Sequence, residues 1–252
     1  MRYFVELAYH GASYHGWQRQ PNASSVQQTL EEAMTTVLRQ PITLVGAGRT
    51  DTGVHARKMV AHFDTDNPLE NKEQLLYQLN HFLPPDIVLY TLRAVTPEAH
   101  ARFDAYARTY HYHLSFAKDP FDQGGSYRFS GTLDVNAMNQ ASGKLLAHQD
   151  FECFSKSKTD VKTYICRIMH AHWESEANGL VFTITADRFL RNMVRAIVGT
   201  LLEVGQGKKS LAQFEAILAS KKRSEAGYSV PAQGLYLMDI QYPESIYMDG
   251  KS

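Results

Sequence analysis

Cysteine is almost absent from this sequence. Only Cys153 and Cys166 occur among the 252 residues. Two thiols so far apart in the chain exclude a disulfide framework, and they give neither a CxxC pair nor a thiol-rich metal motif. We therefore expect both cysteines to be buried and chemically inert.

Long apolar runs and an excess of charge are also missing. No stretch approaches the roughly 18 consecutive apolar residues that suggest a membrane span, and the opening MRYFVELAYHGASY lacks the charged-then-apolar layout of a signal peptide. The sequence predicts a soluble, cytoplasmic protein with no membrane contact. Its 26 basic and 26 acidic residues cancel, so the net charge does not indicate a nucleic-acid partner, and only local clusters of basic residues can.

The glycine-containing segment GAGRTDTGVHA, residues 46–56, does not match the common cofactor motifs. No GK[ST] follows its glycines, which excludes a P-loop, and it is no GxGxxG with an acidic residue about 20 positions later. Asp51-Thr52-Gly53 is the signature triplet of aspartic proteases. Those enzymes need two carboxylates that share one proton, and the chain contains no second DTG. We expect no nucleotide cofactor.

Two histidine pairs have the spacing of strand residues that share one face of a sheet. They are His111 with His113 and His170 with His172. A shared face suits a metal ion, but no Cys, Asp or Glu stands at metal-site spacing nearby. The simpler interpretation is surface or packing histidines, so we expect no metal.

Hydrophobic periodicity predicts the order β-α-β-β-α-β in the first hundred residues. Ser24-Ser25 precede a run with helical spacing, and Pro84-Pro85 end the second helix. The predicted elements are a strand at 2–10, a helix at 26–40, strands at 42–47 and 58–64, a helix at 72–81 and a strand at 86–95. This order is that of a ferredoxin-like unit.

The second half gives the same order less clearly, which indicates a degenerate structural repeat. The predicted elements are a strand at 107–116, a helix at 135–147, strands at 163–174 and 180–186, a helix at 188–203, an inserted helix within 208–223 and a strand at 235–241. We expect an α+β fold of two ferredoxin-like (RRM-like) halves, residues 1–105 and 106–252, joined into one antiparallel sheet. A cleft between the halves is the expected place for chemistry.

The residues of the 46–56 segment leave its role open when they are considered alone. Three glycines permit a tight turn around a charged pair. Asp51 is a candidate nucleophile or acid/base, and Arg49 is a candidate ligand for phosphate or carboxylate. A solvated turn without chemistry is the more common explanation of such residues when they stand alone.

Several ordered blocks, however, resemble the tRNA pseudouridine synthase A family. GAGRTDTGVHA is similar to that family's catalytic loop, and the similarity spans nearly the whole chain. Thr52 stands where the family more often has Ala, and Val230 also departs from it. The other similar blocks are Tyr9-His-Gly, Tyr14-His-Gly-Trp-Gln-Arg-Gln-Pro21, Val26-Gln27, Ala99-His-Ala-Arg-Phe103, Ala107-Arg-Thr-Tyr-His-Tyr112, Asp150-Phe151, Phe154-Ser155, Phe189-Leu-Arg-Asn-Met-Val-Arg-Ala-Ile-Val-Gly199 and Pro231-Ala-Gln-Gly-Leu-Tyr-Leu237.

The resemblance implies an enzyme that isomerises uridine to pseudouridine on the 3′ side of the tRNA anticodon stem-loop, at positions 38–40, without cofactor or metal. It assigns the essential carboxylate to Asp51 and the active-site tyrosine, which stacks on the base, to Tyr110. Arg195 is the expected ion-pair partner of Asp51, and Leu235 the aliphatic residue that packs under the tyrosine ring. Arg49 is expected to steady the RNA where the base has been expelled.

The resemblance also implies a homodimer that binds tRNA. Local basic residues are then candidate phosphate contacts. Lys208 and Lys209 are the leading pair. The other candidates are Lys156, Lys158, Lys162, Lys221, Lys222 and Arg223, while Arg188 and Arg191 are either phosphate contacts or ordinary surface charges.

Two other classes of function remain as alternatives. A non-catalytic RNA-binding module has the same kind of fold, but the sequence lacks the RNP string K/R-G-F/Y-G-F-V-x-F. An aspartyl-type hydrolase requires a second catalytic carboxylate in the cleft.

Overall fold

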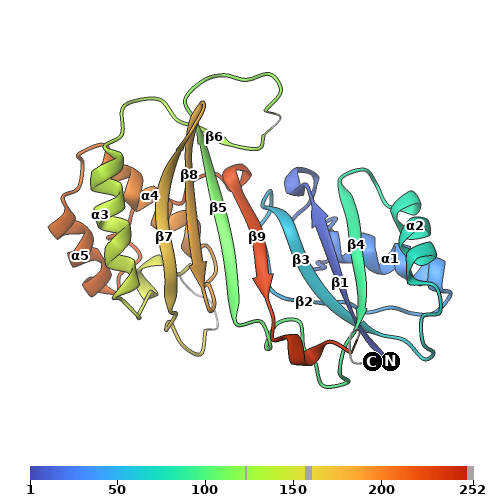
Figure 1. Ribbon diagram of the computed structural model, residues 1–252. Coiled ribbons are helices and arrows are strands. Elements are labelled where there is room, and N and C mark those ends of the chain that lie inside the picture. The colour runs from blue at the N-terminus through green and yellow to red at the C-terminus, as the bar shows by residue number, and fades with distance from the viewer. Residues whose placement is uncertain (123, 157–160, 249–252) are drawn as a thin grey trace. The chain divides into compact units, whose positions relative to one another are not determined.

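A computed structural model describes residues 1–122, 124–156 and 161–248 of the chain (Figure 1). The chain forms two compact units. Unit 1 contains Met1–Tyr106 together with residues 236–248, and unit 2 is Ala107–Leu235. The sequence assigned everything after residue 105 to the second half. The end of the chain groups instead with unit 1, because Tyr247 forms a β-bridge with Val95.

Unit 1 contains a sheet in which the strand order is β4-β1-β3-β9. The central strand β1 pairs antiparallel with both β3 and β4, and β9 pairs parallel with β3 from Tyr236 on. The short strand β2 pairs antiparallel with β3. The bounds are β1 Arg2–Tyr9, β2 Val45–Gly46, β3 His55–Asp64, β4 Ile87–Ala94 and β9 Leu235–Gln241.

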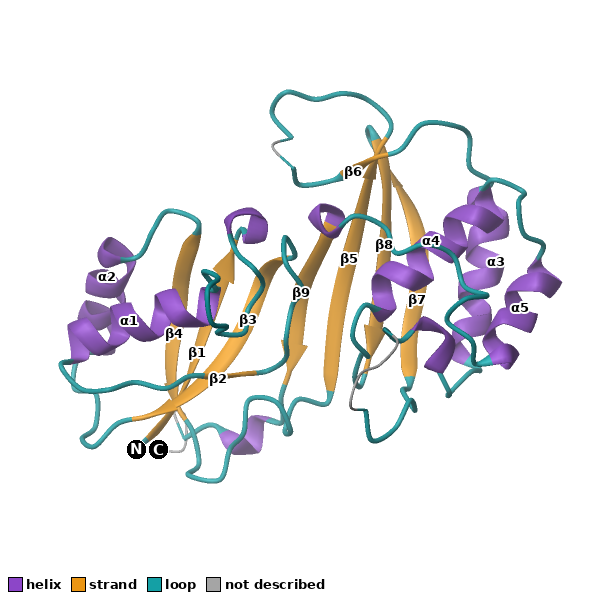
Figure 2. Cartoon of the chain, turned by 180° about the vertical axis from the view of Figure 1, so that it is seen from behind, coloured by secondary structure: helices purple, strands orange, loops and turns teal. Residues whose placement is uncertain are grey.

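Helices α1 (Val26–Leu38) and α2 (Lys72–Phe82) lie on one face of this sheet (Figure 2). The Ser25 side chain caps α1 by accepting a hydrogen bond from the Gln28 amide. Most of the buried side chains of α1 are apolar, which explains the helical spacing of hydrophobic residues in the sequence. The two buried polar side chains are hydrogen-bonded to each other, Gln27 Nε2 donating to the Glu31 carboxylate at 3.0 Å.

Unit 2 contains an antiparallel sheet with the strand order β5-β8-β7. Its core side chains come from matching positions on neighbouring strands. Tyr112 and Trp173 both lie opposite Phe182, and the rings of Trp173 and Phe182 are 4.9 Å apart. The bounds are β5 Ala107–Ser115, β7 Ile168–Glu176 and β8 Gly179–Ala186, with the short β6 Tyr127–Arg128 parallel to β5.

Three helices of unit 2 lie on one face of its sheet (Figures 1 and 2). They are α3 (Val135–Leu146), α4 (Met193–Gly205) and α5 (Leu211–Ser220). Nearly every residue of α4 is buried, so this helix forms the centre of the unit. No helix in the described part of the chain has the length and apolar character needed to cross a membrane.

The structure confirms the predicted elements in kind, but several of their ends differ; β3, for example, begins at His55, three residues before the predicted start. The strand expected at 42–47 is only Val45–Gly46. The strand expected at 163 begins at Ile168, because Ile165 forms a bridge with Asp150 instead. The helix expected at 188 begins at Met193, because Asn192 before it has a left-handed backbone with φ 67°.

Candidate active site

Asp51 lies in the loop between β2 and β3, which we call the Asp51 loop (residues 47–54). The loop turns where the Val54 amide donates to the Asp51 carbonyl at 3.2 Å, and Gly53 provides the left-handed conformation with φ 77°. Thr50 is buried, Asp51 half-buried and Arg49 exposed. The carboxylate is therefore presented by a turn whose preceding residue is fixed in the core of unit 1.

The residue before Asp51 is held on both its side chain and its backbone. The hydroxyls of Tyr9 and Thr50 are 2.8 Å apart and buried. The amide of Trp17 donates to the Thr50 carbonyl at 3.4 Å. Tyr9 and Trp17 are themselves almost completely buried, so the position of Asp51 depends on the end of β1 and the segment that follows it.

The residues after Asp51 are held by the same segment. The Gly53 amide donates to the Tyr14 carbonyl at 3.3 Å. The Tyr14 hydroxyl in turn donates to the carboxylate of Asp86 at 2.8 Å. Burial, and next the bond to Asp86, raises the pKa of the Tyr14 phenol above its usual value. Asp51 thus lies between two anchored neighbours.

Glycines occupy two positions at which the segment after β1 packs closely against the backbone of the Asp51 loop. A methyl group added at Gly16, where φ is 89°, would lie 2.3 Å from the Thr50 carbonyl oxygen. One added at Gly11 would lie 2.0 Å from the Val54 carbonyl oxygen. Only glycine permits the two segments to pack this closely.

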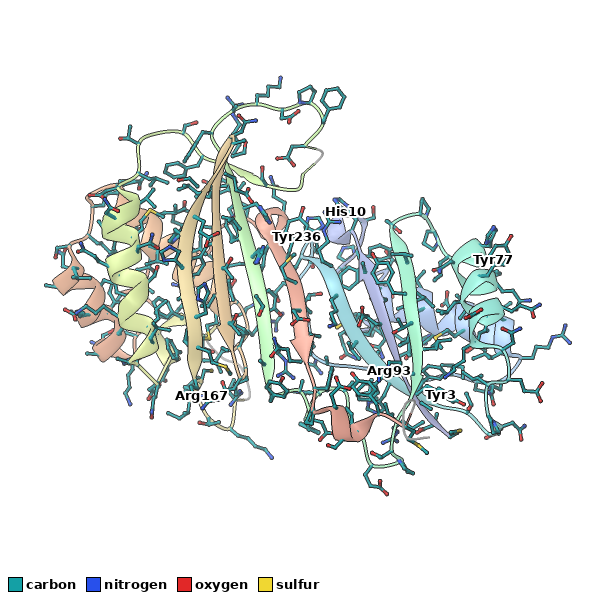
Figure 3. All side chains as sticks on the ribbon, in the orientation of Figure 1. Tyr3, His10, Tyr77, Arg93, Arg167 and Tyr236 are labelled. Carbon is teal, nitrogen blue, oxygen red and sulfur yellow. The ribbon has the colours of Figure 1, made fainter. Side chains whose placement is uncertain are left out.

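His55, the first residue of β3, follows the Asp51 loop, and its ring packs against two other rings. Its buried side chain accepts a hydrogen bond from the Gly11 amide at Nδ1, at 3.0 Å, which assigns the ring proton to Nε2. The ring centroid lies 4.2 Å from that of His10 and 4.6 Å from that of Tyr236. His10 and Tyr236 are labelled close together in Figure 3. These rings fix the direction in which β3 leaves the loop.

Arg49 projects from the exposed side of the loop. Its Nε donates to the side-chain oxygen of Gln18 at 3.1 Å. Gln18 directly follows the anchored Trp17, so the segment that holds Asp51 also orients the Arg49 guanidinium.

In unit 2, Tyr110 lies on β5 opposite Ile184. Its half-buried ring meets the edge of Phe189 at a centroid distance of 5.1 Å and an interplanar angle of 86°. Leu235 is buried, with 6% of its surface exposed. It follows Gly234, where an added methyl group would lie 2.9 Å from the ring of Tyr112.

Arg195 lies in the first turn of α4. Its Nε donates to the Val230 carbonyl at 2.7 Å, and the Val230 amide donates back to the Arg195 carbonyl at 3.2 Å. The Tyr112 hydroxyl donates to the next carbonyl, that of Pro231, at 2.8 Å. Burial raises the pKa of the Tyr112 phenol, which keeps it a neutral donor. Arg195 is thereby tied to the segment 226–231.

The candidate phosphate contacts differ in how they are engaged. Lys209 lies 3.6 Å from the Glu203 carboxylate and donates to the Glu225 carbonyl at 3.4 Å, whereas its neighbour Lys208 is exposed. Lys221 pairs with Asp150 at 2.6 Å. Lys158 lies outside the described residues. The remaining candidates with exposed side chains are Lys156, Lys162 and Lys222.

The histidine pairs lie on the strands where the sequence predicted them. The ring centroids are 5.9 Å apart for His111 and His113 and 6.3 Å apart for His170 and His172. Within the residues that the structure describes, no three His, Cys, Asp or Glu side chains are grouped as metal ligands. Both cysteines are buried, and burial raises their pKa to about 12, which makes them poor nucleophiles at neutral pH.

Sequence reasoning missed the residues that hold the candidate groups. These are Tyr9, Thr50 and Trp17 around Asp51, and Tyr112 with Val230 around Arg195. Tyr9, Trp17, Thr50 and Tyr112 lie within the blocks that carried the family resemblance, but nothing in the sequence showed which groups they would bind.

Comparison with known proteins agrees with the resemblance. The sequence matches the family described as tRNA pseudouridine synthase over residues 7–104 and 141–243. It is 52% identical over 246 residues to "tRNA pseudouridine synthase A" of Parabacteroides distasonis, covering 98% of both chains. The identity is 53% with the protein of the same name from Bacteroides thetaiotaomicron, covering 98% of this chain and 93% of the relative. A protein of that name from Geobacter sp. is 42% identical, over 94% of this chain and 97% of its own. This chain therefore belongs to the tRNA pseudouridine synthase family.

Proposed function

We propose that this protein isomerises uridine to pseudouridine in tRNA, on the 3′ side of the anticodon stem-loop (positions 38–40), with Asp51 as the essential carboxylate. The observation that carries the proposal is the Asp51 loop, because it presents a half-buried carboxylate between neighbours anchored at Thr50 and Gly53. The name shared by relatives that cover almost the whole chain supports the choice of RNA substrate.

The reaction explains why such a carboxylate is needed. The bond from uracil N1 to the ribose C1′ breaks, the base turns, and C5 bonds to C1′. C5 loses its proton and N1 takes one up, so the product has the composition of the substrate and nothing is oxidised or reduced. The enzyme must supply an ionised carboxylate beside the ribose, a surface that holds the detached base, and exclusion of water. Asp51 supplies the first of these.

Arg195 is the proposed partner of Asp51. Its Nε is engaged by the Val230 carbonyl, and that bond sets the plane of the guanidinium. The two terminal nitrogens are then the groups that meet a carboxylate, in the forked geometry that arginine favours. A pair of this kind keeps Asp51 ionised and fixes its orientation.

Tyr110 is the proposed stacking surface for the uracil, with Leu235 packed under its ring. Aromatic stacking typically contributes about 1–3 kcal/mol per base. The perpendicular contact with Phe189 limits the rotation of the Tyr110 ring. Tyr110 lies outside the residues of the family match, so its role depends on the resemblance of the block around it.

Arg49 is the proposed group that steadies the RNA once the base has left the stack, a step that costs a few kcal/mol. Its planar guanidinium can both stack and bind phosphate. Lys208 and Lys209 are the proposed phosphate contacts, and the exposed Lys208 is better suited to this role than Lys209.

We also propose that the two halves are ferredoxin-like and join their sheets, with the active site in the cleft between them. The element order β1, α1, β2, β3, α2, β4 in unit 1 and the strand order β5-β8-β7 in unit 2 support the ferredoxin-like character of each half. From the family resemblance alone, we propose that the enzyme acts as a homodimer in the cytoplasm.

The test is incubation of the purified protein with unmodified tRNA, followed by chemical mapping of pseudouridine. We expect new pseudouridines confined to the 3′ side of the anticodon stem-loop. Binding of tRNA without any pseudouridine would identify a non-catalytic RNA-binding module instead. Tyr110→Ala should lose most of the activity, and full activity of Tyr110→Phe would assign the tyrosine to stacking alone.

A further inference from the structure

Arg223 was a candidate phosphate contact in the sequence, but its side chain is directed into unit 2. The residue is half-buried and lies shortly after the end of α5. Its Nη1 donates to the Gly227 carbonyl at 2.9 Å and to the Ala226 carbonyl at 3.4 Å. Its Nη2 donates to the Ser229 hydroxyl at 2.9 Å. One guanidinium thus holds three points of the segment 226–231.

The same segment is attached to α4 along its length. The Gly227 amide donates to the Thr200 hydroxyl at 2.9 Å. The side-chain amide of Asn192, which precedes the helix, donates to the Ser229 hydroxyl at 2.5 Å. The Ser229 hydroxyl is therefore shared between Asn192 and Arg223, and it joins the start of α4 to the guanidinium.

Tight packing makes the position of this segment sensitive to its contacts. A methyl group added at Gly199 of α4 would lie 1.8 Å from the Tyr228 carbonyl oxygen. Immediately after Ser229 comes Val230, whose carbonyl accepts from Arg195 Nε at 2.7 Å. A shift of the segment is consequently passed to the guanidinium of Arg195.

We propose that Arg223 is a positioning residue that orients Arg195 through the segment 226–231 and that it is not a phosphate contact. The inference rests on the proposed function, since it assumes that Arg195 acts in the chemical step. A lysine at position 223 would keep the charge but could not bridge two acceptors that lie on opposite prongs of the guanidinium fork.

Substitutions at position 223 therefore distinguish a positioning role for Arg223 from a role as a phosphate contact. Arg223→Lys and Arg223→Gln should both lower the single-turnover rate at saturating tRNA, roughly ten- to a hundredfold, as expected from a misplaced reacting group. The dissociation constant for tRNA and its salt dependence should stay at the parent values. Lys222→Gln, at the exposed neighbouring position, measures what the loss of one surface charge does to affinity and salt dependence.

A double variant in the Arg195→Ala background provides the second test of the inference. If Arg223 acts through Arg195, adding Arg223→Gln there should lower the rate no further. Amide exchange at Gly227 and Val230 should accelerate in both position-223 variants. If position-223 variants do not fold, Ser229→Ala removes one shared acceptor and should give a smaller rate loss with unchanged affinity.

Parent-like rates in Arg223→Lys, together with weaker binding and a reduced salt dependence in Arg223→Gln, would overturn the inference and restore the phosphate role. Independent losses from Arg195→Ala and Arg223→Gln would also overturn it. Failure of the parent protein to form pseudouridine would instead contradict the proposed function, which keeps the two failures apart.

Discussion

The Asp51 loop of unit 1 and the segment 226–231 of unit 2 hold their functional groups in different ways. The Asp51 loop is a turn whose backbone packs against another backbone, and glycines such as Gly16 make that approach possible. The segment 226–231 also packs its backbone closely against α4, but its carbonyls are in addition tied down by side-chain donors, among them Tyr112 and Arg223.

The Asp51 loop and the segment 226–231 should therefore respond differently to some substitutions but not to others. Adding a side chain should damage both regions, because a methyl group has no space at Gly16 or at Gly199, where it would lie 1.8 Å from the Tyr228 carbonyl oxygen. Removing a side-chain donor should damage the second region most, because backbone carbonyls would lose their partners.

The largest effect is expected from Gly16→Ala. The added methyl group would lie 2.3 Å from the Thr50 carbonyl oxygen, at a residue with φ 89°, so we expect a loss of about 3 kcal/mol or more in stability and a large loss of activity. Gly48→Ala is the matched control, because no atom lies within 4 Å of the added methyl group. Thermal unfolding of both variants provides the measurement, and equal midpoints would contradict the backbone-packing account.

A pair of Tyr→Phe variants compares the two regions by removal of one hydroxyl from each. Tyr112→Phe deprives the Pro231 carbonyl of its donor and should cost about 1–2 kcal/mol. Tyr9→Phe leaves the rotatable Thr50 hydroxyl, which can turn to another acceptor, and should cost about 0.5–1 kcal/mol. Chemical denaturation checks the order, and a larger loss for Tyr9→Phe would reverse the comparison.

The smallest effects on stability are expected at two adjacent lysines of unit 2. Lys209→Gln removes the cation beside the Glu203 carboxylate and should cost about 0.2–0.5 kcal/mol. Lys208→Gln should leave stability unchanged but weaken tRNA binding, with a salt dependence lower by about 0.7–0.9 log units per log unit of salt. Titrations at several salt concentrations measure this change, and an unchanged slope for Lys208→Gln would remove it from the set of phosphate contacts.

Much of the fold could be predicted because local patterns determine it. The apolar spacing in 26–40 gave α1, and the alternation in 235–241 gave β9 with its observed bounds. The start of α4 could not be predicted, since it depends on the left-handed backbone of Asn192, a conformation that the hydrophobic pattern of 188–203 does not reveal.

The family resemblance predicted the candidate reacting groups, but it did not predict the hydrogen bonds that hold them in place. Asp51 and Arg195 stand within similar blocks. The bond from Arg195 to the Val230 carbonyl joins residues 35 positions apart, and Arg223 Nη1 ends on the backbone oxygens of Ala226 and Gly227. Every residue carries a carbonyl, so no residue type signals which one will be used.

The central claim is that the Asp51 carboxylate is essential for uridine isomerisation, and Asp51→Asn tests it most directly because the change removes the charge and keeps the shape. Pseudouridine formation in unmodified tRNA should be measured beside the thermal midpoint and the dissociation constant for tRNA. We predict that folding and binding match those of the parent protein while turnover is abolished. Turnover within tenfold of the parent protein would contradict the claim.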